Sequence, residues 1–171
     1  LTHRLNRAAT SLANYKIDLF MGDIKQMYTE LEHSELKTAV QWLIATFTNH
    51  FGRYTTLKVK RHPYKEPSLK YLNVILGSSK VADNKYYTIT MKQLEEIVHF
   101  DIDNTYFKVG TAIYKQIQGI PMGSNLSPAL AYLICTYYER RIPKLIPQAR
   151  LSRIFGARYL DDILIARILQ H

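Results

Sequence analysis

The sequence contains one cysteine, Cys135, among 171 residues. A single cysteine excludes a disulfide within the chain and a zinc site built from several cysteines. It fits a reducing compartment, and its simplest role is that of a small apolar residue on a helix. The six histidines are scattered and form no HExxH-like pair. Long apolar runs are also lacking: ALAYLIC is far shorter than the roughly 20 residues of a membrane helix, so we expect no membrane partner.

Acidic residues are few, with 14 Asp and Glu against 23 Lys and Arg and a formal net charge of +9. This excess favours a polyanionic partner, and nucleic acid before membrane. Basic residues gather in GRYTTLKVKRHPYKEPSLK (52–70), which we expect to be a surface hairpin or loop. Lys58, Lys60 and Arg61 are candidate contacts for a primer–template backbone. A solvated basic loop remains the alternative.

Internal repeats, low-complexity tracts and linkers are absent from the sequence, so we expect one domain or part of a larger one. The sequence begins with Leu1 and stops directly after an apolar arm. We interpret it as a piece of a longer protein.

The predicted elements alternate between strands and helices. YKIDLFMGD (15–23) predicts a buried strand, and apolar spacing predicts a helix between an N-cap at Ser34 and a stop at Gly52. YLNVILG (71–77) is compatible with strand or helix. KYYTIT (85–90) predicts a strand.

The second half of the sequence continues the pattern. Thr90 and Gln93 form a capping box for a helix whose expected apolar face is Leu94, Ile97, Val98 and Ile102. A hairpin turning near Gly110 and a glycine-rich loop, GIPMGSN, follow. Ser127 and Pro128 are the expected N-cap and N1 residues of the next helix. FGARYLDDILIARIL (155–169) predicts a strand, a tight turn and a strand. The fold class is therefore α+β, with an antiparallel sheet backed by helices.

Two of the predicted strands carry carboxylates at one end. Asp23 closes the first strand, and Asp161 and Asp162 lie at the turn of the last hairpin. If these strands are neighbours, three carboxylates meet at one edge and repel each other unless cations neutralise them. Mg²⁺ prefers such oxygen ligands, and two metal ions can promote phosphoryl transfer. A solvated turn, in which Asp is common, is the simpler reading of Asp161 and Asp162.

Three segments in this order resemble the palm of a reverse transcriptase. FMGDIKQMY is similar to the first palm motif, GIPMGSNLSPALAYL to the glycine-loop-and-helix motif, and RYLDD to the Tyr-x-Asp-Asp motif. The stretch from NTYFKVG through YKQIQG to the Met-Gly-Ser loop resembles Penelope-like retroelements, which are relatives of telomerase. Most other reverse transcriptases have Gln at the place of Met122.

The resemblance implies a right-hand polymerase palm with part of the fingers, and RNA-directed DNA synthesis at a primer 3′-hydroxyl. It implies two Mg²⁺ ions, with Mn²⁺ as a substitute, and three partners: an RNA template, a DNA primer and a deoxynucleoside triphosphate. The implied roles are as follows: Asp23, Asp161 and Asp162 as catalytic metal ligands, the Ile24 carbonyl as a further ligand, Tyr28 as a steric gate against ribonucleotides, Met122 and Gly123 beside the nucleotide, and Tyr159 near the primer terminus.

Other readings stay open. The family's upstream fingers motifs and its later palm and thumb segments have no counterpart in residues 1–171, so we expect a partial domain that is inactive alone. A non-catalytic nucleic-acid-binding remnant of a retroelement is the main alternative. An RNA-dependent RNA polymerase is a third, although Leu160 replaces the usual Gly before the two aspartates. The sequence leaves the oligomeric state open.

Overall fold

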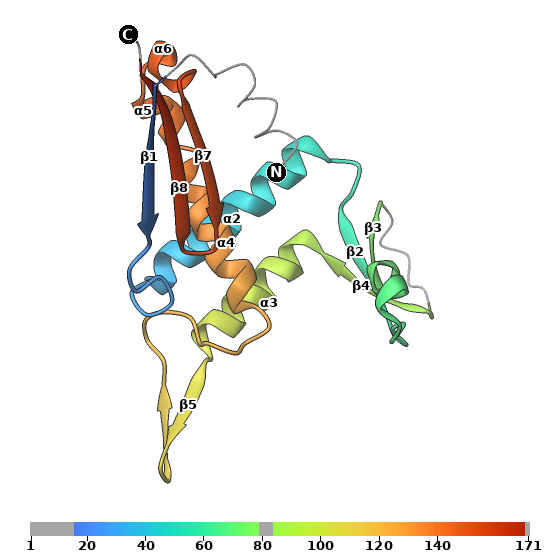
Figure 1. Cartoon of the computed structure of the whole chain (residues 1–171). Coiled ribbons are helices and arrows are strands. Elements are labelled where there is room, and N and C mark those ends of the chain that lie inside the picture. The colour runs from blue at the N-terminus through green and yellow to red at the C-terminus, as the bar shows by residue number, and fades with distance from the viewer. Residues whose placement is uncertain (1–15, 79–83, 170–171) are drawn as a thin grey trace. The chain divides into compact units, whose positions relative to one another are not determined.

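The computed structural model describes residues 16–78 and 84–169 (Figure 1). Tyr15, the first residue of the predicted first strand, lies outside this range. The described residues fold as two compact units: unit 1 comprises residues 16–27 and 135–169, and unit 2 comprises residues 28–78 and 84–134. Within the described part of the chain, no helix combines the length and apolarity needed to cross a membrane.

Unit 1 is built around a three-stranded antiparallel sheet in the order β1-β8-β7 (Figure 1). The strands are β1 (Lys16–Asp23), β7 (Ile154–Tyr159) and β8 (Asp162–Leu169). The last two form the predicted hairpin, and β1 pairs with β8 from Lys16 opposite Leu169 to Asp23 opposite Asp162. Two short helices, α5 (Ile142–Leu145) and α6 (Gln148–Leu151), precede β7.

The expectation that 15–23 is a buried strand is wrong in one respect. The segment is a strand, but most of its side chains are exposed; Leu19 and Met21, for example, are 70% and 81% accessible. Among the described strands, β1 pairs with β8 alone and forms an edge of its sheet, so apolar side chains along it can remain exposed.

Unit 2 begins with α2 (His33–His50), whose residues Leu36, Ala39 and Val40 are buried at helical spacing. Helix α3 (Met91–Asp103) packs beside it and buries Met91 and Ile102. Lys37 of α2 donates to both carboxylate oxygens of Asp103 at 2.6 and 2.7 Å. That hydrogen bond lowers the pKa of Asp103.

Two further sheets belong to unit 2 (Figure 1). One has the order β3-β2-β4, with β2 (Thr56–Lys60), β3 (Val74–Gly77) and β4 (Tyr86–Thr90); the 3-10 helix η1 (Pro67–Asn73) precedes β3. The other is the hairpin of β5 (Tyr106–Val109) and β6 (Ala112–Lys115), which turns at Gly110 as predicted. The single antiparallel sheet expected from the sequence is therefore divided into three small ones.

Several local predictions are confirmed and others are wrong. Thr90 and Gln93 form the predicted capping box of α3. Helix α2 begins at His33, so Ser34 lies inside it, and its hydroxyl donates to Glu32 instead of capping the helix. Ile97 is 53% exposed, because it lies at the side of α3 that faces away from the buried Ile102.

The helix after the glycine loop is α4 (Ser127–Glu139). The buried hydroxyl of Ser127 donates to the carbonyl of Pro121 at 2.6 Å, and so ties the loop to the helix start. The prediction of Ser127 as a flanking N-cap is wrong, because Ser127 is itself the first helical residue.

Candidate functional site

The sheet of unit 1 places three candidate residues in one row. Asp162 on the central strand β8 pairs with Asp23 on β1 and with Tyr159 on β7. Because directly paired residues of a sheet project from the same face, these three side chains share a face at the end of the sheet. All three are exposed, Tyr159 to 78%. The sequence predicted only that the carboxylates would meet at one sheet edge. The direct pairing of Asp162 with Asp23 and Tyr159 comes from the structure.

Asp161 lies in the two-residue turn that joins β7 to β8. Its carbonyl accepts a hydrogen bond of 3.0 Å from the Ile24 amide, so the turn is fastened to the end of β1. Leu160, the other turn residue, has φ of +53°. A left-handed conformation costs a non-glycine residue about 1–2 kcal/mol. The turn that carries Asp161 is therefore strained, as functional turns often are.

The donor types of this site suit Mg²⁺, since Asp23, Asp161, Asp162 and the Ile24 carbonyl all offer oxygen. The backbone positions are also adjacent, as the pairing of Asp23 with Asp162 and the Ile24–Asp161 bond require. The side chains are not gathered around one point: within residues 16–78 and 84–169, no group of three His, Cys, Asp or Glu side chains could hold a metal ion. The donor chemistry and the backbone placement therefore suit a cation, whereas the described side-chain positions do not form a metal site.

Two charged residues that the sequence analysis did not single out lie behind this turn. Arg158 of β7 donates to both carboxylate oxygens of Glu139, the last residue of α4, and its Nη1 donates to the Leu160 carbonyl at 2.9 Å. Burial raises the pKa of the Cys135 thiol; the Arg158 charge opposes this rise, and the Glu139 and Asp161 charges add to it. The charges of Arg158, Glu139 and Asp161 therefore all act on Cys135, near the end of α4. The Arg that directly precedes Tyr-Leu-Asp-Asp was the available signal.

In unit 2, the glycine loop and the segment that contains Tyr28 are hydrogen-bonded to each other. Gly119 donates to the Leu31 carbonyl at 2.7 Å, and Ile120 donates to the Tyr28 carbonyl at 2.8 Å. Gly119 has φ of +77°, and a Cβ there would lie 2.5 Å from the Tyr28 oxygen. Only glycine allows this approach. The structure thus brings the predicted gate residue next to the predicted nucleotide loop.

Met122 and Gly123 lie at the open side of the same loop. Met122 is 78% exposed. Gly123 has φ of +102°, and a Cβ there would meet no described atom within 4 Å. Tyr28, Met122 and Gly123 belong to unit 2. Asp23, Asp162 and Tyr159 belong to unit 1.

The candidate basic residues Lys58, Lys60 and Arg61 lie on β2 and directly after it. Lys58 and Lys60 alternate along the strand and share one face of the β3-β2-β4 sheet. The Lys60 ammonium lies 3.1 Å from the centroid of the Tyr64 ring, and the Arg61 guanidinium lies 4.2 Å from that of Tyr87. Tyr64 and Tyr87 are 40% and 53% exposed. The cations therefore rest on exposed rings, an arrangement stabilised by cation–π attraction.

The loop that carries Tyr64 is ordered by one side chain. The Asn73 amide accepts from the Tyr64 backbone amide at 2.7 Å and donates to the Tyr64 carbonyl at 3.1 Å. This pairing closes the loop after β2. The segment is therefore strand, ordered loop and 3-10 helix, which refines the predicted surface hairpin or loop.

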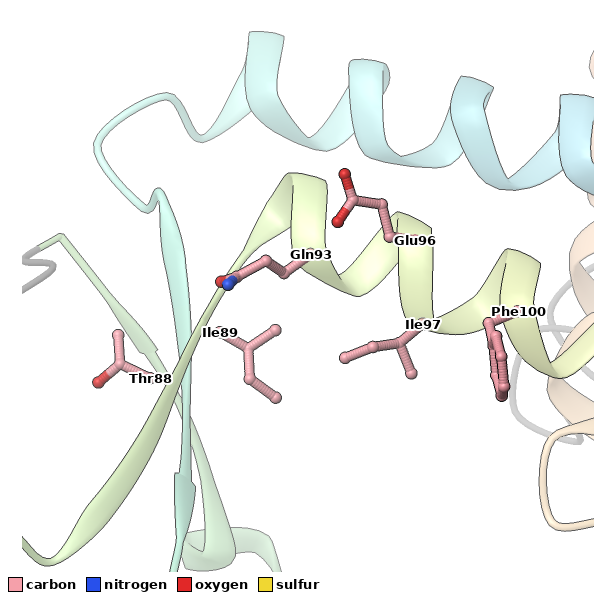
Figure 2. A pocket seen from close by; sticks show the side chains of 6 residues that line it. All are labelled: Thr88, Ile89, Gln93, Glu96, Ile97 and Phe100. Carbon is pink, nitrogen blue, oxygen red and sulfur yellow. The ribbon is translucent and has the colours of Figure 1, made fainter.

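An open pocket lies where β4 runs into α3 (Figure 2). Figure 2 shows that its side chains come from the end of β4 and from successive turns of α3: Thr88, Ile89, Gln93, Glu96, Ile97 and Phe100. Glu96 is its one charged lining residue and is near Lys92, at 3.9 Å. None of the predicted site residues lines it.

The chain aligns with the structure of apo telomerase from Candida tropicalis with a TM-score of 0.68 and 19% identity, over 96% of this chain and 26% of that one. The chain shares its fold with part of telomerase. The telomerase from Candida albicans, solved with the TWJ fragment of telomeric RNA, aligns with a TM-score of 0.65 and 17% identity, over 97% of this chain and 25% of that one.

The matched chains are much longer than this one, which spans about a quarter of their length. No protein-family model matches the sequence, and no curated protein sequence matches it. The telomerase structures therefore support the polymerase-like fold expected from the motifs, with small antiparallel sheets in place of one larger sheet.

Proposed function

We propose that the chain is the palm, with part of the fingers, of a telomerase-like reverse transcriptase. The main support is the β1–β8 register, in which Asp23 pairs with Asp162 and the Ile24 amide bonds to the Asp161 turn. These carboxylates are 138 and 139 positions apart in sequence, yet they lie at one sheet end. A purely structural role does not explain why Asp23 lies directly opposite Asp162, because like charges in a directly opposed pair destabilise a sheet.

Asp23, Asp161, Asp162 and the Ile24 carbonyl would hold two Mg²⁺ ions, or Mn²⁺. Bound there, the ions would lower the pKa of a primer 3′-hydroxyl and stabilise the charge on the leaving pyrophosphate. The chain's own contribution is to orient the reactants. Tyr159, which pairs with Asp162 and is exposed, would contact the primer terminus.

The glycine loop would hold the incoming deoxynucleotide. Tyr28 would exclude a ribose 2′-hydroxyl by steric contact, and its backbone bond to Ile120 holds it beside the loop. Met122 and Gly123 form the exposed part of that loop and would lie beside the base and sugar.

An RNA template and a DNA primer would be the macromolecular partners. The formal charge of +9 supports a polyanionic partner, and Lys58, Lys60 and Arg61 would contact its backbone. Two of the matched telomerase structures were solved with the TWJ fragment of telomeric RNA, which supports RNA as a class of ligand. The sequence motifs from Asn104 to Ser124 favour a Penelope-like retroelement as the source, and this remains part of the proposal.

The test is primer extension on an RNA template, with Mg²⁺ and deoxynucleotides, by a full-length protein that contains this chain, because the chain spans about a quarter of the matched telomerases. Asp161→Asn should abolish incorporation and leave duplex binding unchanged, because the carboxylate is needed for metal binding and not for backbone contacts. Asp18→Asn is the matched control: it also lies on the sheet but pairs with Arg167, so its activity should equal that of the unaltered protein. Full activity of Asp161→Asn would refute the assignment.

The same assay tests the gate. Tyr28→Ala should admit ribonucleotides that the unaltered protein rejects, since removal of the ring opens space at the 2′ position. Unchanged sugar selection would place the gate elsewhere.

A non-catalytic nucleic-acid-binding remnant is the second candidate. It is favoured by one observation, that the described carboxylate side chains are not gathered as a metal site. On this reading the protein binds duplex through its basic segment and incorporates nothing with either metal.

A further inference from the structure

Arg158 has a charged side chain that is only 8% exposed, and it contacts two different elements of unit 1. Its Nε and Nη2 donate to the two carboxylate oxygens of Glu139 at the end of α4. Its Nη1 donates to the carbonyl of Leu160 at 2.9 Å. A buried guanidinium with a carboxylate on one side and a carbonyl on the other is geometrically fixed, because its planar fork matches both acceptors at once.

The carbonyl that Arg158 holds belongs to the strained residue of the turn. Leu160 has φ of +53° and, unlike Asn or Asp, has no polar side chain to stabilise that conformation locally. Such a backbone persists only where surrounding contacts hold it. Two contacts do so here: Arg158 binds the Leu160 carbonyl, and the Ile24 amide binds the next carbonyl, that of Asp161.

We propose that Arg158 is a positioning residue that holds the Asp161 turn against the end of β1. The Glu139 carboxylate fixes the guanidinium, the guanidinium fixes the Leu160 peptide, and that peptide sets the place of Asp161 beside Asp23. The inference rests on the proposed function only in that Asp161 is taken as a metal ligand. The part that concerns the turn depends on geometry alone.

Arg158 and Tyr159 are neighbours in sequence but project from opposite faces of β7. The face with Asp23, Asp162 and Tyr159 is exposed, and Arg158 reaches Glu139 from the other face. Arg158 therefore supports the turn from behind and would not touch the reactants.

Arg158→Lys separates geometry from charge. Lysine keeps the positive charge near Asp161, but its single ammonium cannot reproduce a fork that binds Glu139 with two nitrogens and Leu160 with a third. An effect of this variant therefore reports the lost fork. Arg167→Lys is the matched control, because Arg167 is in the same sheet and pairs with Asp18 at 2.6 Å on an exposed surface.

The first measurement is amide hydrogen exchange at Ile24, whose N–H is protected by the Asp161 carbonyl only while the turn keeps its place. In Arg158→Lys, exchange at Ile24 should accelerate by about tenfold or more, while amides in the middle of the β1–β8 ladder keep their protection. In Arg167→Lys, Ile24 should exchange as in the unaltered protein. Unchanged protection of Ile24 in Arg158→Lys would overturn the inference.

The second measurement is Mg²⁺-dependent nucleotide incorporation by a full-length protein that contains this chain. Arg158→Lys should lower kcat by about 10-fold to 100-fold, with the KM for deoxynucleotide and the affinity for duplex unchanged, because only the position of Asp161 is altered. A rise in KM with kcat unchanged would contradict the positioning role. Arg167→Lys should show the kcat of the unaltered protein.

The two measurements distinguish this inference from the proposed function. If the full-length protein that contains the unaltered chain incorporates nothing, the proposed function fails, and the exchange of Ile24 still decides the role of Arg158. If Arg158→Lys does not fold, Glu139→Gln replaces it: this variant leaves the Leu160 bond in place and removes the charge that anchors the guanidinium. Glu139→Gln should accelerate exchange at Ile24, by less than the roughly tenfold change expected of Arg158→Lys. If Glu139→Gln leaves the exchange of Ile24 unchanged, the inference is overturned.

Discussion

Gly119→Ala should destabilise unit 2 strongly, because Gly119 is the point where the glycine loop meets the Tyr28 segment. Its φ of +77° is unfavourable for alanine, at about 1–2 kcal/mol. The new Cβ would lie 2.5 Å from the Tyr28 oxygen and 2.9 Å from that of Thr29, both backbone atoms that cannot rotate away. Relief requires the two segments to separate.

Separation would break two backbone hydrogen bonds, from Gly119 to Leu31 and from Ile120 to Tyr28. Each is worth about 0.5–1.5 kcal/mol net. Added to the conformational term, the expected loss is about 2–5 kcal/mol in the free energy of unfolding of unit 2.

Gly110→Ala is the matched control. Gly110 has φ of +62°, similar to that of Gly119, but a Cβ there would meet no described atom within 4 Å. It should therefore lose only the conformational term, about 1–2 kcal/mol, less what alanine gains by restricting the unfolded chain.

Urea unfolding followed by tryptophan fluorescence measures the difference. The one tryptophan, Trp42, lies in α2 and reports on unit 2. If Gly119→Ala is no more destabilising than Gly110→Ala, the close approach of the loop to Tyr28 is wrong, and the placement of the gate beside the nucleotide loop is wrong with it.

Two smaller predictions concern the helices of unit 2. Thr90→Ala should lower the free energy of unfolding of unit 2 by about 0.5–2 kcal/mol, because it removes the capping box of α3. Thr38→Ala is its control: it removes an exposed hydroxyl in α2 and should change the same free energy by less than about 0.5 kcal/mol in the same urea titration. Lys37→Met should cost up to about 1 kcal/mol near neutral pH, since the pair with Asp103 is partly exposed. Because the pKa of Asp103 is lowered in the folded protein, this stabilisation is present above pH 3.8 and disappears as the pH falls through the folded-state pKa. The unfolding curves of the Lys37→Met variant and the unaltered protein should therefore converge in acid. A difference in the free energy of unfolding that stays constant with pH would contradict the ion pair.

Local chemistry explains which predictions were confirmed. The capping box, the turn at Gly110 and the final hairpin each depend on residues within a few positions of one another, so their sequence pattern is sufficient. The two N-cap predictions, Ser34 and Ser127, were wrong by one or two residues at the helix starts, whereas the error about burial arose where tertiary surroundings decide. Apolar composition at 15–23 predicted burial, but an edge strand can be apolar and still exposed.

The sequence by itself determined the candidate carboxylates, the glycine loop and the basic segment, because each is defined by residue types in a short motif. It could not determine that Asp23 pairs with Asp162, since strand partners so distant in sequence are chosen by the whole sheet and not by either strand. Only the tertiary structure decided that Gly119 lies against Tyr28 and that Arg158 pairs with Glu139 at the end of α4. Both are contacts between separate segments, and local periodicity carries no record of them.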